Sequence, residues 1–315
     1  MSLPEGAPRK PKALRKGSKV AVFAPASPAE QLDVTAGLAE LRRLGYEFIP
    51  VQFPGPEGYF AASLESRREG FLKAARHPDI AALVAVRGGY GANFLLDNGL
   101  SAELQEPKCV IGFSDLTSLQ TYLWQMRGWV TFHGPMVAAG LNRGADDSHG
   151  YDEHSFLQAV GNSTGGWEMN LLGKVLASGA AEGRLLGGCL TLLQTTLGTP
   201  WELDTAGSIL VLEDRGLRPY QLDRALMHLK QAGKFDAVKG IILGEFPDSE
   251  PSAKNSPTIH DVCARILRPL GLPIVFGAAI GHTNRPMLTL PLGVQARLSA
   301  TGAGRLEILE PAVLG

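Results

Sequence analysis

Short apolar runs alternate with helix-patterned segments through the first half of the chain. The apolar runs have the length of strands, and the segments between them carry apolar residues at the three- and four-residue spacing of a helix. The expected strands are residues 20–24, 48–51, 80–86 and 109–113, and the expected helices are residues 32–44, 63–76 and a segment from Asp115. Strands joined by helices of this length form right-handed βαβ units, so the alternation predicts a parallel sheet. We therefore expect an N-terminal α/β domain with a flavodoxin-like parallel sheet over residues 19–140.

The second half of the chain is expected to form a separate domain. Residues 141–180 are rich in Gly, Asp, Asn and Ser and show little periodicity, so we expect a linker that lies as a loop near the site. Residues 181–315 mix helix-like and strand-like segments, with strands more frequent toward the end. This pattern predicts a C-terminal mixed α/β, strand-rich domain. Residues 1–18 carry five basic side chains and are expected to be a flexible basic arm.

Composition and charge exclude several classes of protein. The net charge of the 315 residues is −1, so neither nucleic acid nor a membrane surface is expected as a partner. No apolar run approaches the roughly 18 residues of a membrane span, and the apolar stretch after the basic arm is too short for an export signal. The three cysteines, Cys109, Cys189 and Cys263, lie far apart among apolar neighbours, which is typical of buried free thiols in a reducing compartment. We therefore expect a cytoplasmic protein, and one without a metal site because no ligand spacing is present.

A serine is the strongest candidate for chemistry in the first domain. Ser114 follows an apolar run that ends at Gly112, and a helix-like pattern begins immediately after it. A serine at such a turn projects its hydroxyl from the carboxyl edge of the sheet, next to helix N–H groups that can stabilise an oxyanion. The glycine-rich segment 87–91 also follows a strand and is expected to face the same crevice. The competing interpretation of Ser114 is an ordinary N-cap, which these residues by themselves favour.

A nucleophilic serine needs a base within hydrogen-bond reach and an acid that orients this base. Two histidines follow apolar strand-like runs, His133 and His282, and a buried structural role is favoured for His133. The candidate acids are Glu213 and Asp214 at the end of one expected strand and Glu245 at the end of the next. Spacing by itself does not choose among the three acids.

Eight short motifs together resemble the LD-carboxypeptidases, the serine peptidase family that includes the muramoyltetrapeptide carboxypeptidases and the microcin C immunity peptidases. They are VFAPAS (22–27), RGGYG (87–91), IGFSD (111–115), FHGP (132–135), LGGCL (186–190), LVLED (210–214), GHT (281–283) and LPLG (290–293). Each motif is weak, whereas the ordered set over nearly the whole chain is highly specific. The α/β-hydrolases share the order Ser, Glu, His, but their G-x-S-x-G motif has a second glycine where this chain has Leu116.

The resemblance assigns roles to three side chains. It implies that Ser114 is the nucleophile, that His282 is the base and that Glu213 orients this histidine. The oxyanion would be held by the backbone N–H groups of Asp115 and Gly89. The resemblance implies acyl transfer through an acyl-enzyme, with no metal and no organic cofactor.

The substrate that the resemblance implies is a murein tetrapeptide, cut between the L-centre of a diamino acid and the terminal D-alanine. Such an enzyme would serve the recycling of cell-wall fragments, and we expect a homodimer. Arg285 is a candidate for binding the free carboxylate of the substrate, with an ion pair to a nearby acid as an equal alternative. Tyr90 and His133 are further candidates for contact with the substrate.

Two other functions remain open at this point. An immunity-type peptidase that cleaves peptidyl or aminoacyl nucleotides would need an aromatic platform for the base, and Trp167 is the one obvious candidate. A non-catalytic protein whose two lobes close on a small ligand is less favoured, because a complete Ser, Glu, His set is present. The chain also departs from the expected family pattern at Cys189, where we expect Asn in many relatives, and at Leu217, where we expect an acid. Both departures concern the lining of the site, and Cys189 itself is expected to be an inert apolar thiol.

Overall fold

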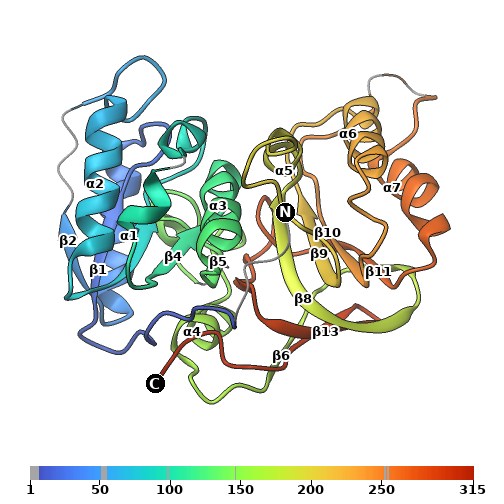
Figure 1. Ribbon diagram of the computed structural model, residues 1–315. Coiled ribbons are helices and arrows are strands. Elements are labelled where there is room, and N and C mark those ends of the chain that lie inside the picture. The colour runs from blue at the N-terminus through green and yellow to red at the C-terminus, as the bar shows by residue number, and fades with distance from the viewer. Residues whose placement is uncertain (1–6, 51–54, 98, 146, 252, 254) are drawn as a thin grey trace.

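Two β-sheets, one built mainly from each half of the chain, lie side by side in the computed structural model (Figure 1). The structure describes residues 7–50, 55–97, 99–145, 147–251, 253 and 255–315. The predictions made for residues 1–6 and for Val51 fall outside these ranges. None of the helices within the described ranges is both long enough and apolar enough to cross a membrane.

The first sheet has the strand order β12-β5-β4-β3-β1-β2. Its strands are β1 (Lys19–Phe23), β2 (Glu47–Pro50), β3 (Ile80–Ala85), β4 (Cys109–Gly112), β5 (Thr131–His133) and β12 (Leu290–Leu292). The five strands from the first half are parallel and follow the flavodoxin-like order 2-1-3-4-5, as predicted. The sixth, β12, comes from the second half and runs antiparallel to β5. The prediction of an all-parallel sheet confined to residues 19–140 is therefore wrong at this edge, because β12 pairs with the otherwise unpaired side of β5 and buries two leucines there.

Helices and 3-10 turns connect these strands close to the predicted positions. The helices are α1 (Gln31–Arg43), α2 (Leu64–Arg76) and α3 (Thr117–Arg127), and the 3-10 turns are η1 (Ala92–Leu95), η2 (Leu100–Glu103), η3 (Ser114–Leu116) and η4 (Leu141–Arg143). The side chain of Ser63 caps α2 by accepting a hydrogen bond from the Ser66 N–H. Helix α3 ends at Gly128, whose φ of 65° is the left-handed conformation that stops a helix.

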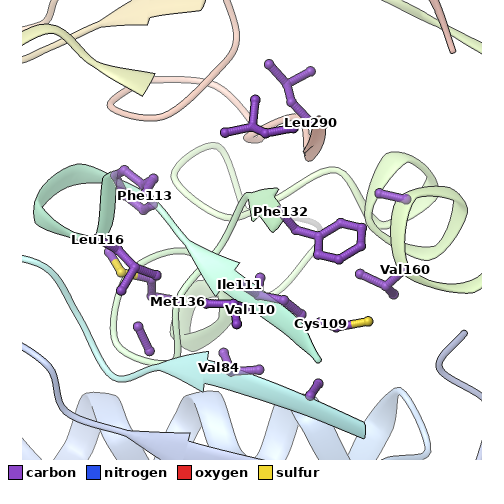
Figure 2. Packing of buried hydrophobic residues seen from close by; sticks show 14 of the residues in the cluster. Val84, Cys109, Val110, Ile111, Phe113, Leu116, Phe132, Met136, Val160 and Leu290 are labelled. Carbon is purple, nitrogen blue, oxygen red and sulfur yellow. The ribbon is translucent and has the colours of Figure 1, made fainter. Parts of the chain in front are cut away.

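The core of the first sheet is continuous across its strands. Val84, Ile111 and Phe132 lie on the adjacent strands β3, β4 and β5 and are buried in one cluster (Figure 2). Val160 of helix α4 (Glu153–Gly161) and Leu290 of β12 join the same cluster. Because burial of such a side chain stabilises a fold by about 1.5–3 kcal/mol, this cluster fixes the strand ends that carry the site.

The second sheet has the order β6-β14-β13-β8-β9-β10-β11-β7. Its strands are β6 (Trp167–Asn170), β7 (Lys174–Ala177), β8 (Gly179–Cys189), β9 (Ser208–Glu213), β10 (Gly240–Gly244), β11 (Ile274–Ala278), β13 (Gln295–Ala300) and β14 (Arg305–Ile308). Strands β8 to β11 are parallel, and the flanking strands are antiparallel, so the sheet is mixed as predicted. The helices of this half are α5 (Leu190–Thr195), α6 (Pro219–Gln231) and α7 (Ile259–Leu267), with a 3-10 turn η5 (Arg268–Leu270).

The segment expected to be a linker is instead built into the fold. Residues 141–180 contain helix α4 and the edge strands β6 and β7, and the long strand β8 begins at Gly179. Asp152 caps α4 by accepting a hydrogen bond from the Ser155 N–H. The two strands are four residues long, which is too short for a reliable alternating signal in the sequence. The predicted boundary before residue 181 therefore falls inside a strand.

The described part of the basic arm, residues 7–18, is held against the body of the protein. The backbone of Arg9 is hydrogen-bonded to Gly128 and Val130, at 2.7 and 3.0 Å. Lys10 forms an ion pair with Glu310 at 2.6 Å. The prediction of a flexible arm is wrong for these residues, because paired backbone groups and partners from the far end of the chain fix it.

Candidate active site

Ser114 lies on a strained turn between strand β4 and helix α3. Its φ is 62°, a left-handed conformation that is uncommon for a residue with a Cβ. Such strain persists only where the surrounding structure enforces it, and it is concentrated at functional positions. The N-cap position is Phe113 for η3 and Leu116 for α3, and neither cap uses a side-chain hydrogen bond. Ser114 is therefore not an ordinary N-cap.

The glycine-rich turn after β3 lies directly against Ser114. A Cβ added to Gly88 would come within 2.9 Å of the Ser114 Cβ and 3.0 Å of its Oγ, so only glycine fits without a shift. The neighbouring Gly89 has a φ of 106°, and a Cβ there would overlap Ser27. Ser27 Oγ accepts a hydrogen bond from the Tyr90 N–H at 3.2 Å. Two loops at the switch point of the first sheet, after β1 and after β3, thus hold each other beside the serine.

Two buried charged side chains, Asp115 and Arg67, hold the glycine-rich turn through hydrogen bonds to its backbone. The carboxylate of Asp115 accepts a hydrogen bond from the Ala92 N–H at 2.7 Å, and burial raises the pKa of Asp115 to about 6. The guanidinium of Arg67, a residue 4% exposed, donates to the carbonyl oxygens of Pro25 and Gly91 at 2.6 and 2.8 Å. Asp115 therefore positions the turn with its side chain, and its backbone N–H at the start of η3 remains the predicted oxyanion contact.

Glu213 and His282 form a buried pair in the second half of the chain. Glu213 is the last residue of β9 and is fully buried. Its Oε2 lies 2.7 Å from His282 Nδ1 and also accepts a hydrogen bond from the His282 backbone N–H at 2.9 Å. Gly281 allows this approach, since a Cβ there would come within 2.3 Å of the Glu213 carboxyl carbon. Because the carboxylate only accepts, Nδ1 carries the proton and Nε2 is left as the basic nitrogen.

Burial and pairing act on this couple in opposite directions. Burial disfavours the charged imidazolium, but the charge of Glu213 and its hydrogen bond outweigh burial, so the pKa of His282 is raised. Burial likewise disfavours the Glu213 carboxylate, yet the contacts with His282 outweigh it and lower the pKa of Glu213. The pair therefore stabilises a protonated base next to an ionised acid, which is the charge distribution that proton abstraction requires.

His133 lies behind the pair, away from solvent. Its side chain is fully buried, and its Nε2 is 3.8 Å from Glu213 Oε1. The ring of Phe113 lies against both histidines, with its centroid 6.1 Å from His133 and 5.1 Å from His282. Burial lowers the pKa of His133 and keeps it neutral. The favoured prediction of a buried, hydrogen-bonded His133 is confirmed for burial and wrong for the hydrogen bonds, since neither ring nitrogen has a partner among the described residues. A fully buried ring does not support the suggested contact with the substrate.

Arg285 is held by contacts other than the suggested one, while Tyr90 follows the cavity-lining Gly89 and its contact with the substrate stays a prediction. Arg285 Nε is 2.5 Å from Glu245 Oε1, and its guanidinium donates to the carbonyl oxygens of Leu172 and Gly277. The ion-pair alternative is therefore the one observed, and Glu245 organises this loop without touching the imidazole. Tyr90 is 43% exposed and packs against Tyr59, Phe60 and Phe94.

Ser114 and His282 line the same cavity, which has a volume of about 570 Å³. Residues from both halves surround it, and they are Arg87, Gly88, Gly89, Phe113, Ser114, Met136, Ala138, Ala139, Cys189, Thr191, Leu192, Asp214, Arg215, Leu217 and His282. The volume is in the range of small-molecule sites. Among the described residues no group of three or more His, Cys, Asp or Glu side chains could hold a metal ion.

The cysteines behave as predicted from their apolar neighbours. Cys109, Cys189 and Cys263 are free and buried. Burial, reinforced by the nearby Glu213 and Asp214 carboxylates, raises the pKa of the Cys189 thiol well above its ordinary value. Cys189 therefore contributes bulk to the cavity wall and is not a nucleophile.

Comparison with known proteins assigns the chain to a family. Profiles described as the LD-carboxypeptidase N-terminal domain and the LD-carboxypeptidase C-terminal domain match residues 20–134 and 182–298. A protein of Bacillus subtilis named "Probable murein peptide carboxypeptidase" is 34% identical over 310 residues, which cover 96% of this chain and 95% of that protein. The chain belongs to the LD-carboxypeptidase family. It is a serine carboxypeptidase, as the ordered motifs predicted.

Two further relatives of this LD-carboxypeptidase show how wide the family is. The crystal structure of a muramoyltetrapeptide carboxypeptidase from Oxalobacter formigenes matches with a TM-score of 0.80 at 30% identity, covering 93% of this chain and 99% of that chain. The microcin C7 self-immunity protein MccF of Escherichia coli is 28% identical over 321 residues, covering 90% of both proteins. The fold is thus shared by relatives whose names indicate different substrates.

Sequence reasoning missed the residues that hold the LD-carboxypeptidase site in place. Arg67 lies near the start of helix α2, in a segment rich in charged residues, and nothing in the sequence indicates its burial. Ser27 ends the VFAPAS motif, but its hydrogen bond to the glycine-rich turn was not predicted. Arg87 lines the cavity and was noted only as part of the glycine-rich segment. A charged residue directly after a strand end in a parallel sheet is the signal that could have identified Arg87.

Proposed function

We propose that this LD-carboxypeptidase hydrolyses the bond between the L-centre of a diamino acid and the terminal D-alanine of murein tetrapeptides. Ser114 would be the nucleophile, His282 the base and Glu213 the acid that orients this base. The observation that carries the proposal is the shared cavity, where a strained serine from the first half meets a histidine paired with a buried glutamate from the second.

The proposed reaction is acyl transfer in two steps. His282 Nε2 takes the hydroxyl proton as Ser114 Oγ attacks the scissile carbonyl carbon, and the developing imidazolium is stabilised by Glu213. The oxyanion would accept hydrogen bonds from the backbone N–H groups of Asp115, which directly follows the serine, and of Gly89, which lines the same cavity. Collapse of the tetrahedral intermediate breaks the C–N bond, and His282 gives its proton to the leaving amine. Water then hydrolyses the acyl-enzyme by the same two proton transfers, and no metal or organic cofactor is required.

The test is the release of free D-alanine from a murein tetrapeptide, with Ser114→Ala as the matched control. The wild-type enzyme should release D-alanine, and the variant should not, while both show the same thermal unfolding midpoint. Equal release by both proteins would refute the role of Ser114. Absence of release by a folded wild-type enzyme would refute the murein assignment. Comparison of lysine- and diaminopimelate-containing peptides, free or linked to sugar, would then define the substrate range.

An immunity-type activity is the second candidate, favoured by the similarity to MccF. Its predicted aromatic platform is not at the site, because Trp167 is 9% exposed and lies in β6, where it pairs with Ile308. We therefore rank this activity below murein hydrolysis and would test it with an aminoacyl sulfamoyl adenylate. We further propose action in the cytoplasm as a homodimer, which cell fractionation and light scattering of the purified protein would test.

A further inference from the structure

Two arginines line the cavity, and they differ in what they bind. Arg215 lies next to Asp214 and forms an ion pair with Asp248, which leaves its charge compensated. Arg87 makes one hydrogen bond among the described residues, to the carbonyl oxygen of Pro28 at 3.2 Å, and has no carboxylate partner there. Arg87 therefore lines the cavity and leaves most of its guanidinium donors open.

Arg87 is adjacent in sequence to the residue that contacts the nucleophile. It directly precedes Gly88, the residue whose α-carbon lies against the Ser114 side chain. In a carboxypeptidase substrate the scissile carbonyl and the terminal carboxylate are separated by a single residue, which is about one Cα–Cα step of 3.8 Å. The carboxylate therefore lies close to the reacting carbonyl, in the part of the cavity that Arg87 and Gly88 line.

Small side chains stand next to Arg87. The turn of residues 136–140 runs beside the end of β3, since the N–H groups of Val137 and Ala138 donate to the carbonyl oxygens of Ala85 and Val86 at 3.0 and 2.8 Å. Ala138 and Ala139 consequently line the cavity on the same side as Arg87. The opposite wall, from the second half of the chain, carries the larger Leu192 and Leu217 together with Thr191 and Asp214. This asymmetry fits a substrate whose leaving residue places its methyl group and carboxylate on the arginine side, while the longer side chain of the preceding diamino acid lies on the other side.

We propose that Arg87 binds the terminal carboxylate of the substrate, with Ala138 and Ala139 forming the pocket for the methyl group of the leaving amino acid. This inference rests on the proposed function and names the subsite that makes the enzyme a carboxypeptidase. A guanidinium can bind a carboxylate through two parallel N–H···O bonds, which fixes the orientation of the peptide end as well as its charge. Arg285 has no such role, because its guanidinium already donates hydrogen bonds to Glu245 and to two backbone carbonyl oxygens.

The test compares two substrates, a murein tetrapeptide with a free terminal carboxylate and the same peptide with a C-terminal amide. For the wild-type enzyme, kcat/KM should be about 10- to 100-fold higher for the acid, as expected for a hydrogen-bonded charged group. Arg87→Met should lower kcat/KM for the acid by a similar factor and bring the acid-to-amide ratio close to one. Arg87→Lys should retain part of this preference, since the charge remains and the fork is lost. Arg285→Met is the matched control and should keep the wild-type ratio.

The possible outcomes distinguish the role of Arg87 from the proposed function of the enzyme. An acid preference in Arg87→Met equal to that of the wild type would overturn the assignment of Arg87, whatever the absolute rates. Absence of cleavage of both peptides by a folded wild-type enzyme would overturn the proposed function and this subsite with it. Calorimetry on Ser114→Ala and on the double variant Ser114→Ala/Arg87→Met gives a readout without turnover. The acid peptide should bind the first about 10- to 100-fold more tightly than the second, and equal binding would overturn the proposal.

Discussion

Replacing Glu213 with glutamine should separate the charge of this residue from its geometry. Oε2 of the carboxylate accepts both hydrogen bonds from His282, and an amide oxygen in its place can keep both. Oε1 has no hydrogen-bond partner among the described residues and faces His133 Nε2 at 3.8 Å, which leaves room for an amide nitrogen. The substitution therefore removes a negative charge while leaving the backbone and the His282 tautomer largely in place.

The expected loss follows from the distance between the two charges. Charge centres about 4 Å apart attract by about 4 kcal/mol at an effective dielectric constant of about 20. If the imidazolium develops in the transition state, losing this attraction should lower kcat by about 10³-fold, since each factor of ten corresponds to about 1.4 kcal/mol. The acid-to-amide change in other serine peptidases lowers kcat by about 10⁴-fold, and that loss includes a change of histidine tautomer, so a smaller loss is expected where the tautomer is kept.

The loss of the Glu213 charge should also change how activity and stability depend on pH. Burial lowers the pKa of His282 and the charge of Glu213 is the largest effect that raises it, so removing that charge should lower the pKa of His282. The acidic limb of kcat/KM, which reports the base of the free enzyme, should therefore move to lower pH in Glu213→Gln. Stability should respond in a defined window. The raised pKa of His282 contributes stability below its ordinary value of 6.5, and the lowered pKa of Glu213 contributes above its ordinary value of 4.5. The variant should thus be most destabilised between pH 4.5 and 6.5, where both contributions are present, and less so at more acidic and more alkaline pH.

The assay is D-alanine release over pH 5 to 9 together with thermal unfolding at the same pH values. Glu245→Gln is the matched control, because Glu245 directly follows the neighbouring strand β10 and binds the loop after His282 without touching the imidazole. We expect the control to lose less than about 10-fold in kcat and to keep its acidic limb. A kcat within 10-fold of wild type for Glu213→Gln, or an acidic limb that stays or moves to higher pH, would refute the reasoning.

Three further predictions follow from contacts around the serine. Gly88→Ala should lower kcat/KM by at least about 10²-fold, because the added methyl group would lie 2.9 Å from the Ser114 Cβ. The control Gly161→Ala has a nearest contact of 3.5 Å and should leave kcat/KM unchanged in the same assay. Arg67→Met should lower the free energy of unfolding by at least about 3 kcal/mol in urea titration, since it leaves buried carbonyl oxygens without donors; a loss under 1 kcal/mol would contradict this. Iodoacetamide at pH 8 should leave Cys189 unmodified in the native enzyme, as judged by mass spectrometry, because burial raises the pKa of its thiol; rapid alkylation would show that this residue is accessible.

Local patterns in the sequence predicted the fold class and most of the first sheet. The alternation of residues 20–127 predicted a parallel sheet with flavodoxin-like strand order, because periodicity and βαβ handedness are properties of neighbouring residues. The motif around Ser114 indicated a strand-to-helix turn for the same reason. The edge strands β6 and β7 and the added strand β12 were missed, since segments of three or four residues are stabilised by pairing with distant strands and carry little local signal.

The site depended on contacts between distant residues. Residue spacing left Glu213, Asp214 and Glu245 equivalent, and the family resemblance favoured Glu213; the fold puts Glu213 on the imidazole of His282, 69 residues away, and gives Glu245 to the loop beyond it. The same holds for Arg67, which resembles a surface residue in the sequence and is buried beneath the glycine-rich turn. The sequence by itself therefore determined the fold class, the family and the residue types of the site. Only the tertiary structure decided which charges are buried together, because burial and pairing arise when segments far apart in the chain meet.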